Sequence, residues 1–387
     1  MIKKYLHYLA RIDEKKEQMS ALVEKWANIA SGSNDLSGLN LMLQELKQHF
    51  STFDGKMQEH TLKNGSALSI QKRESAHIQV LLCGHMDTVY SHHVTCIKEG
   101  NYLVGPGVAD MKGGLVILLT ALQAFESFSH AKHIGWTILI TPDEEIGSIY
   151  SKPLLQEYAK KNSVGLVFEP ALPDGSLVVE RMGSTNYRIV FKGIAAHVGR
   201  SFYEGKSAIS ALASFIKEVE KEYKTDTKSI LNFGHITGGS APNVVAENAT
   251  CSINFRSSSL DDMASFDTLL KKIKTLISHE HSVEIYIFQE SLRAPKLFDE
   301  KSKKLFQRIQ ECAHDLGITI DGKSTGGVCD GNTLARAGLC NIDTMGPKGE
   351  FLHSAKERLD LESLTERAKL TCLFLLKLAS KEISLWA

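Results

Sequence analysis

The sequence predicts an α/β protein with a second, ferredoxin-like domain inserted into the first. Two observations predict this fold. In the first part of the chain, short apolar runs alternate with a segment of helical apolar spacing, an order typical of an α/β domain with a mainly parallel sheet. In the middle of the chain, the segments follow the order βαββαβ, which is typical of a four-stranded sheet with two helices on one face.

Three short apolar runs and one helical pattern define the first domain. The runs 77–83, 136–141 and 164–168 are predicted strands, and residues 115–125 form a predicted helix. Polar groups follow each predicted strand. Catalytic residues of such sheets usually lie at the carboxyl ends of the strands. We therefore expect the functional residues of this domain at that edge.

Six alternating segments define the inserted domain. In chain order they are a strand, a helix, two strands, a helix and a strand, at 187–191, 207–219, 231–236, 250–255, 263–277 and 283–288. The rest of the chain returns to alternating helix and strand and completes the first domain. The predicted boundaries are a first domain of 1–182 continued by 292–387, and an inserted domain of 183–291.

Composition narrows the classes of function. The 45 basic and 45 acidic side chains balance, so nothing predicts a nucleic-acid or membrane surface. The first twenty residues are charged throughout and lack an apolar signal core. The longest apolar run, around 115–119, is interrupted by Gly114 and Gln123, so we expect no membrane span. Seven cysteines, an odd number without a CxxC pair, indicate reduced thiols and a cytoplasmic location.

Short clusters of metal-type ligands follow the predicted strands. Each taken alone is typical of a loop or turn. Together they supply the carboxylates and imidazoles that zinc takes. His85 and Asp87 are two residues apart, so on a strand they point the same way. The clusters are residues 84–88, the glycine-rich segment 105–114, residues 141–147, residues 168–170 and, far downstream, residues 346–354.

The motifs, taken in order, carry a family resemblance. They are HMDTV, GPGVADMKGG, TPDEEIGS, FEP, GIAAHVGR, GGSAPNVV, GGVCDGN and GPKGEFLHS. This set resembles the dinuclear zinc metallopeptidases that include glutamate carboxypeptidase, acetylornithine deacetylase, succinyl-diaminopimelate desuccinylase and aminoacylase. The glutamate carboxypeptidase branch is the most similar, because of the last two motifs. The resemblance implies a zinc-peptidase-like domain with a mixed sheet flanked by helices, interrupted by a ferredoxin-like lid that forms a homodimer.

The resemblance also implies a metal site. It makes Asp110 a bridge between two zinc ions per subunit, for which Co²⁺ or Mn²⁺ could substitute. Glu144 would be the general base, Asp87 would orient one histidine ligand, and a cis peptide bond would join Asp110 to Met111. Three carboxylates and one hydroxide would balance the four positive charges. The implied metal ligands are His85 and Glu169 on one side, Glu145 and His353 on the other, and the bridging Asp110.

The lid would supply further site residues. By resemblance, His197 reaches the partner subunit's active site and stabilises an oxyanion. Asn243 would contact the substrate. Arg256 and Arg293 would bind its carboxylate, because a guanidinium binds a carboxylate at two points, and Gly327 would add a backbone N–H. On the residues alone, an ordinary loop histidine is the favoured interpretation of His197, and a surface arginine is as consistent with Arg256 as a binding role.

Four positions depart from the pattern of the family. Cys329 stands where serine or threonine is more usual, and Lys348, Glu350 and Phe351 replace small residues before His353. We expect the last three to enlarge and charge the pocket wall. The sequence therefore does not predict which side chain the substrate carries.

The predicted function is zinc-dependent hydrolysis of an amide bond beside a free carboxylate, with a small peptide or N-acyl amino acid as substrate. Carboxypeptidase activity is the preferred interpretation. N-acyl-amino-acid deacylase activity, of the acetylornithine deacetylase or desuccinylase type, is the alternative. A non-catalytic dimeric binding protein on the same scaffold is the alternative from another class, and the complete ligand set with Glu144 argues against it.

Overall fold

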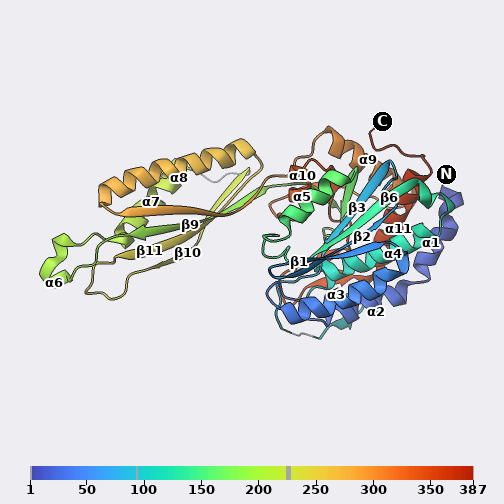
Figure 1. Ribbon diagram of the computed structural model, residues 1–387, viewed down its shortest axis with the longest axis horizontal. Coiled ribbons are helices and arrows are strands. Elements are labelled where there is room, and N and C mark those ends of the chain that lie inside the picture. Colours follow the sequence, from blue (N-terminus) through green and yellow to red (C-terminus); the bar gives the residue numbers. More distant parts are fainter. Residues whose placement is uncertain (1, 93–94, 224–227, 387) are drawn as a thin grey trace. The chain divides into compact units, whose positions relative to one another are not determined.

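The computed structural model describes residues 2–92, 95–223 and 228–386, and the chain divides into two compact units (Figure 1). The first unit runs to Glu180 and resumes over Leu297–Thr325 and from Cys329 onward. The second comprises Arg181–Lys296 and the tripeptide Gly326–Val328. Each unit has its own hydrophobic core, so each is described by itself.

A six-stranded mixed sheet forms the centre of the first unit. Its order is β1 (Lys56–Leu62), β2 (Gly65–Lys72), β6 (Ile134–Thr141), β3 (Ile78–His85), β7 (Val164–Val167) and β14 (Asn341–Ile342). The neighbours of β3 and the β7–β14 pair are parallel, whereas β1 and β2 join antiparallel. The mixed sheet that the family resemblance implies is therefore confirmed.

Helices cover both faces of this sheet, because successive strand residues point to opposite sides. Val80 and Leu82 of β3 pack into the larger core, whereas Leu81 and Cys83 pack into a smaller one. The larger core is covered by α1 (Leu6–Asp13), α2 (Lys16–Ala27), α3 (Leu36–Phe50), α4 (Gly114–Glu126), α9 (Glu300–Asp315) and α11 (Leu361–Ala379). The smaller core is covered by α5 (Lys152–Lys161) and α10 (Asp330–Arg336).

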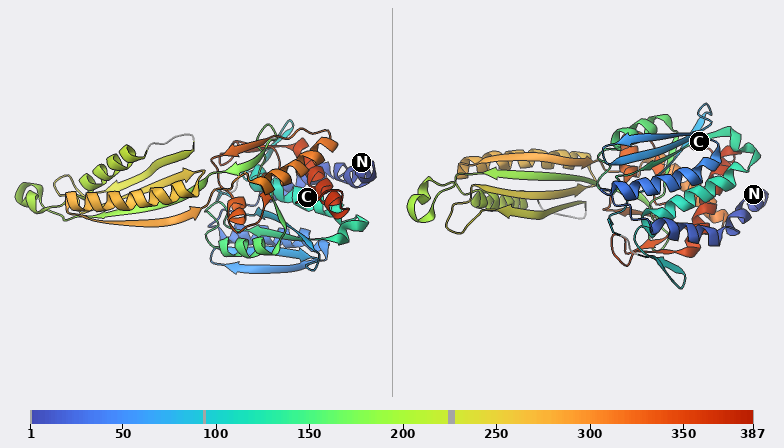
Figure 2. Two further views of the ribbon diagram at one scale, coloured as in Figure 1. Left: turned by 90° about the horizontal axis from the view of Figure 1, so that it is seen from above. Right: turned by 60° about the horizontal axis from the view of Figure 1, so that its bottom comes forward.

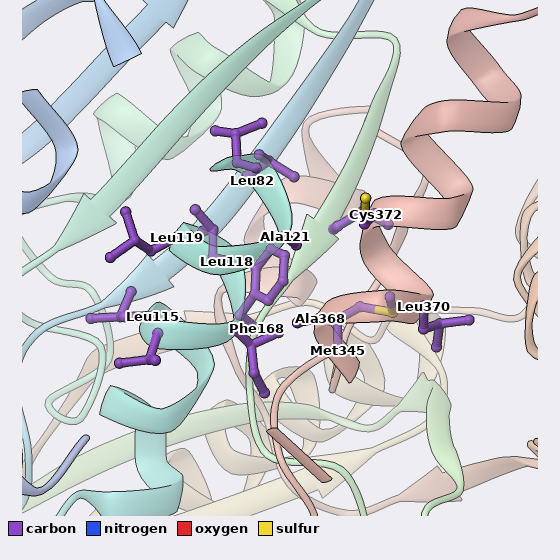
Figure 3. Close-up of a cluster of buried hydrophobic side chains, with 14 of the residues drawn as sticks. Leu82, Leu115, Leu118, Leu119, Ala121, Phe168, Met345, Ala368, Leu370 and Cys372 are labelled. Carbon is purple, nitrogen blue, oxygen red and sulfur yellow. The ribbon is translucent and has the colours of Figure 1, made fainter. Parts of the chain in front are cut away.

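Helix α4 is the centre of the larger core. Figure 3 shows its side chains, among them Leu115 and Leu118, gathered with Phe168 and with residues of α11. Helix α4 can approach Phe168, the residue after β7, because Gly114 has no side chain. A Cβ at Gly114 would lie 2.0 Å from the Phe168 carbonyl oxygen.

The segment Val108–Glu126 is long and apolar enough to cross a membrane by length and composition alone. This corrects the sequence-based expectation that no run reaches that length. The segment is longer than the apolar run seen in the sequence because it includes η3 (Val108–Gly113), a turn that is kinked at Asp110 and Met111, where the backbone angles are not helical, before α4 begins. Of the apolar window, 94% is buried inside the protein, where it forms the core helix.

Shorter elements surround the sheet. A second sheet of the first unit has the order β15 (Gly349–Glu350), β16 (Arg358–Asp360), β5 (Tyr102–Val104) and β4 (Ile97–Glu99). Strands β8 (Leu177–Arg181) and β13 (Gly322–Thr325) form a pair. Single 3-10 turns are η1 (Ile2–Tyr5), η2 (Ser51–Phe53), η4 (Ser129–His133) and, in the second unit, η5 (Phe202–Glu204).

The second unit has the ferredoxin-like order that the sequence predicts. Its antiparallel sheet has the order β10 (Ser229–Gly238), β11 (Asn248–Ser257), β9 (Gly183–Lys192) and β12 (Glu284–Arg293). Helices α7 (Ala208–Glu222) and α8 (Leu260–His281) lie on one face (Figure 2), where Tyr187, Ile189 and Phe191 of β9 point into the core. The short helix α6 (Val198–Ser201) follows β9. Strand β12 continues to Arg293, beyond the predicted boundary at residue 291.

Candidate metal centre

The candidate ligands of the first unit meet at the carboxyl edge of its sheet. His85 is the last residue of β3, the segment with Glu144 and Glu145 follows β6, and Glu169 follows β7. These three strands are parallel neighbours, so the residues after them come together at one edge. Asp110 joins them from the kinked segment before α4, where its own backbone angles are not helical.

One group of donors surrounds His85. Its Nε2 atom lies 3.2 Å from Asp110 Oδ1 and 3.7 Å from Glu169 Oε1. All three side chains are buried, and these three atoms make no hydrogen bond within the described residues. Donor atoms of His85, Glu144 and Glu169 also lie within 4.8 Å of one another. Glu144 therefore lies at the same site, beside the first group.

A second group of donors surrounds His353. Its Nε2 atom lies 3.3 Å from Asp110 Oδ2 and 3.2 Å from Glu145 Oε2. The His353 side chain is half exposed, whereas Asp110 and Glu145 expose no more than 10% of theirs. The two oxygens of Asp110 thus face two different histidines, each with its own carboxylate. This is the arrangement expected of a carboxylate that bridges two cations.

The spacing of these donors fits a divalent metal ion. Two ligands at tetrahedral angles and 2.0–2.1 Å from one zinc ion lie about 3.3 Å apart. The observed separations of 3.2, 3.2, 3.3 and 3.7 Å lie around that value. Buried polar atoms without a hydrogen bond are costly unless a ligand or ion satisfies them. The donor set of two imidazoles and three carboxylates is one that zinc takes.

Electrostatics point the same way. Burial raises the pKa of Glu169 to about 8, against the opposing effect of His85. Burial likewise raises the pKa of Glu145 to about 7, and the charge of Asp110 adds to the shift. Hydrogen bonds to Asp110 and Glu145 raise the pKa of His353 to about 11. The crowded carboxylates thus need nearby positive charge to stay ionised, which a bound cation would supply.

Asp87 positions the site through two different groups. Its backbone carbonyl oxygen lies 3.0 Å from His85 Nδ1, and its Oδ1 lies 3.3 Å from the same nitrogen. A proton on Nδ1 facing these acceptors leaves Nε2 free to bind a metal. The Asp87 carboxylate also accepts hydrogen bonds from the backbone amides of Glu144 and Glu145, each at 3.1 Å, and from the Ser33 hydroxyl at 2.7 Å. It therefore holds the turn that carries both glutamates.

The loop of Asp110 contains the expected cis peptide bond, between Asp110 and Met111. Its glycine-rich entry is needed because Gly107 adopts a φ of 70°, and a Cβ there would lie 2.7 Å from Thr88 Cγ2. The loop is anchored by a residue that the sequence analysis missed. The Glu357 carboxylate accepts hydrogen bonds from the backbone amides of this loop. Its only signal in the sequence is an acidic residue four positions after His353.

The residues that depart from the family pattern differ in part from expectation. Lys348 donates to Glu366 Oε2 at 3.1 Å, and Glu350 accepts two hydrogen bonds from Arg358. Each of these charges is therefore paired with an opposite charge, a partner that the sequence did not predict. Phe351 stays 54% exposed, with the Arg358 guanidinium 5.1 Å from its ring centre.

Cys329 is buried and caps α10, where its sulfur accepts from the Gly331 amide. This local role accounts for a side chain with a hydrogen-bond acceptor at a position where serine or threonine is usual in the family. Tyr90 is another residue that the sequence analysis missed. Its hydroxyl donates to the Ser354 carbonyl oxygen at 2.7 Å, beside His353.

The candidate substrate-binding residues of the second unit form two sets. Arg256 and Arg293 both lie opposite Ser184, near the start of β9. Arg256 Nη1 donates to the Gly326 carbonyl oxygen at 2.5 Å, which places Gly327 beside this set. Arg293 is buried, with 8% of its surface exposed.

The other set lies beyond the opposite end of β9. His197 follows that strand and pairs in a bridge with Val244, next to Asn243. The Val198 amide donates to the Asn243 carbonyl oxygen at 3.1 Å. Within this unit the structure therefore brings His197 to Asn243 and brings Arg256 to Arg293 and Gly327, but it does not unite the two sets.

Comparison with known proteins identifies the family. Residues 81–377 match the profile of Peptidase family M20/M25/M40. Carboxypeptidase G2 from Pseudomonas sp. strain RS-16 is 26% identical over 374 residues, covering 93% of this chain and 89% of that protein. Succinyl-diaminopimelate desuccinylase from Nitrosospira multiformis is 25% identical over 309 residues, covering 76% of this chain and 79% of that protein.

A solved structure shares the fold. Aminopeptidase PepT from Bacillus cereus matches with a TM-score of 0.79 at 20% identity, covering 94% of this chain and 99% of that chain. The family resemblance carried by the motifs is thereby confirmed. This chain is a hydrolase that belongs to peptidase family M20/M25/M40.

Proposed function

We propose that this chain hydrolyses an amide bond next to a free carboxylate, as a carboxypeptidase that uses two zinc ions. The observation that carries the proposal is the position of Asp110, whose two carboxylate oxygens face His85 and His353 respectively. One zinc ion would be held by His85, Asp110 and Glu169, and the other by Asp110, Glu145 and His353. Co²⁺ or Mn²⁺ would fit the same donors.

The residues at this site divide the chemistry between them. When bound, the two ions polarise the scissile carbonyl group and lower the pKa of a water molecule toward about 7. Glu144 accepts the proton of that water and passes it to the leaving nitrogen. Its support is geometric: Glu144 lies within the donor group of His85 and Glu169 and is only 8% exposed. Asp87 keeps its backbone in place.

The free carboxylate of the substrate is assigned to Arg256, Arg293 and the backbone N–H of Gly327. Both arginines lie at the same register of the sheet, opposite Ser184. The two arginines flank β9, one on each neighbouring strand, and the planar fork of a guanidinium group matches a carboxylate. A free carboxylate beside the scissile bond is what distinguishes a carboxypeptidase substrate from an internal peptide bond.

His197 and Asn243 are assigned to the active site of a partner subunit in a homodimer formed through the second unit. Three features support this. His197 and Asn243 lie away from the arginine set within their own unit, and β10 is an edge strand of the four-stranded sheet, the kind of strand through which sheets of two chains can pair. Apolar side chains near His197 are also exposed, among them Ile194, Val198 and Phe202. A closed two-fold dimer would cover them.

A second candidate function is deacylation of an N-acyl amino acid. The similarity to succinyl-diaminopimelate desuccinylases at 25–27% identity favours it. Both reactions cut an amide near a carboxylate, so they share the metal centre and differ in the group on the other side of the bond. We also propose a cytoplasmic location, because all seven cysteines are free thiols.

The test is a substrate panel with zinc-loaded protein. It contains dipeptides with varied C-terminal residues, glutamate first, their C-terminal amides, and N-acetyl and N-succinyl amino acids. The proposal expects cleavage of dipeptides with a free C-terminal carboxylate and little cleavage of the matching amides. Preference for the acylated amino acids would select the deacylase. Zinc-loaded protein that cleaves nothing in the panel would overturn both functions in favour of a binding protein.

A further inference from the structure

The Glu357 side chain is buried between two segments that carry candidate metal ligands. It has no measurable exposure, and it lies four residues after His353, just before β16. A buried carboxylate is costly unless hydrogen bonds or charges compensate it. Its partners therefore show what the residue holds in place.

Those partners are the backbone amides of the Asp110 loop. Glu357 Oε1 accepts from Ala109 at 2.9 Å and from Asp110 at 3.0 Å, and Oε2 accepts from Gly107 at 3.0 Å. The Val108 amide, which lies between them in sequence, donates instead to the Gly105 carbonyl oxygen. Backbone amides that converge on one point favour an anion there. Here the anion is a side chain of the protein itself. One of the three amides belongs to Asp110, the residue whose two oxygens face both histidines.

The segment that carries Glu357 is itself fixed to the His353 loop. The Glu357 amide donates to the Ser354 carbonyl oxygen at 3.0 Å, which closes a turn directly after His353. The Tyr90 hydroxyl donates to the same carbonyl oxygen at 2.7 Å. The Glu357 carbonyl oxygen accepts from the Gly105 amide at 2.9 Å, so main chain and side chain both bind the Asp110 loop.

The other end of the Asp110 loop has its own anchor. The Lys112 side chain is buried and its Nζ donates to the Ile29 carbonyl oxygen at 2.6 Å. With Lys112 holding one end, the position of Asp110 depends on what holds the amides of residues 107–110. The Glu357 side chain accepts hydrogen bonds from three of these amides, those of Gly107, Ala109 and Asp110.

We propose that Glu357 is a positioning residue that links the loops of Asp110 and His353 into one unit and thereby sets the affinity of the site for metal. It would touch neither metal nor substrate. The inference rests on the proposed function, because it takes Asp110 and His353 as metal ligands. Substitution of a residue that holds metal ligands in place without touching the metal typically changes metal affinity about 10–100-fold.

The test compares Glu357→Gln with wild type and with Glu362→Gln. Glutamine keeps the size of the side chain but turns one acceptor oxygen into a donor that faces backbone N–H groups. Glu362 is exposed and pairs with Lys16, so its variant controls for loss of one acidic charge nearby. Zinc affinity is measured by competition with a chromogenic chelator, on protein whose circular dichroism shows it folded.

We expect zinc affinity to fall about 10–100-fold in Glu357→Gln and to stay at the wild-type value in Glu362→Gln. A role in stability alone would lower the melting temperature of the variant without this change in affinity. Wild-type affinity in folded Glu357→Gln would overturn the inference. Wild-type protein that binds zinc tightly but hydrolyses no substrate would contradict the proposed function. The comparison of zinc affinities would still decide the role of Glu357 in that case.

Hydrogen exchange provides an independent measurement on metal-free protein. In the wild type, peptides covering residues 105–112 should exchange slowly, because three of these amides donate to a buried acceptor. They should exchange faster in Glu357→Gln, or in Glu357→Asp if the glutamine variant does not fold, while α8 keeps its wild-type rate. Rapid exchange of 105–112 in the wild type, as fast as in the exposed loop around residue 240, would contradict the proposal.

Discussion

Asp87 Oδ1 accepts a hydrogen bond from the backbone amide of Glu144 at 3.1 Å. The second oxygen of the same carboxylate binds the amide of Glu145, the next residue along the chain. One buried aspartate thus fixes both the candidate base and a candidate ligand, while its carbonyl oxygen faces His85. Asp87 is therefore the link between the β3 end and the β6 end of the site.

Asp87→Asn should lower metal affinity and kcat about 10–100-fold without unfolding the protein. The amide group of asparagine would place a donor against one of the backbone N–H groups that Asp87 now accepts. Ser33→Ala removes a single hydrogen bond to the same carboxylate and should have a smaller effect. Steady-state kinetics at saturating zinc, with zinc content measured on the same samples, separates the effect on kcat from the effect on metal affinity. Equal behaviour of the two variants would argue against this role of Asp87.

Glu144→Gln should keep its metal and lose about 10²–10⁴ in kcat, the usual contribution of a general base. Glutamine cannot take the proton from water, but it leaves the five candidate ligands in place. Glu145→Gln is the matched comparison, because it should lose metal as well as activity. A Glu144→Gln enzyme with near wild-type kcat would remove this residue from the mechanism.

Arg293→Ala should raise KM for substrates with a free carboxylate and leave zinc content unchanged. Loss of a charge-assisted hydrogen bond costs about 1.5–3 kcal/mol, which corresponds to roughly 10–150-fold. Arg188→Ala serves as control, since Arg188 lies in the same four-stranded sheet but forms an exposed ion pair with Glu290. If the Arg293 variant still discriminated acids from amides as the wild type does, another residue must bind the carboxylate.

Removal of metal should destabilise the protein. A ligand that binds only the folded state stabilises it by about 2.7 kcal/mol at 100 times its Kd. Chelation should therefore lower the thermal midpoint by several degrees, and zinc should restore it. Calcium should not, because it prefers oxygen ligands and the site contains two histidines. Equal midpoints with and without chelator, on protein shown to have held zinc, would contradict a metal site that is coupled to folding.

Mixed dimers test the assignment of His197. His197→Ala and Glu144→Gln homodimers should each be nearly inactive, whereas a dimer with one chain of each kind should have one intact site and about half the wild-type activity. His279→Ala, an exposed histidine of α8, controls for loss of a surface imidazole. Differently tagged chains verify subunit exchange. Verified heterodimers without activity would place His197 in its own subunit or outside the reaction.

The fold was predictable because local periodicity decides it. The alternation at 187–191 and the helical spacing at 263–277 mark faces that become β9 and α8 of one core. The pairing of strands was harder to predict from the sequence. No local pattern shows that Arg256 and Arg293, far apart in sequence, both come to lie opposite Ser184.

The site was predictable where a residue type carries chemistry, and not where its partner decides its role. His85 and Asp110 stand in motifs that point to metal binding. Glu357 is an isolated acidic residue in the sequence. Only the folded loop shows the three backbone amides that donate hydrogen bonds to its carboxylate. Lys348 and Glu350 were predicted without partners, because their partners Glu366 and Arg358 come from α11 and β16 and no local pattern shows the pairing.

The central claim is that Asp110 bridges two metal ions, and anomalous X-ray diffraction from zinc-soaked crystals at the zinc absorption edge tests it most directly. The account predicts two anomalous peaks per chain, one between Asp110 Oδ1 and His85 Nε2 and one between Asp110 Oδ2 and His353 Nε2. A single peak per chain in crystals of active enzyme, or two peaks of which neither lies beside Asp110, would contradict it.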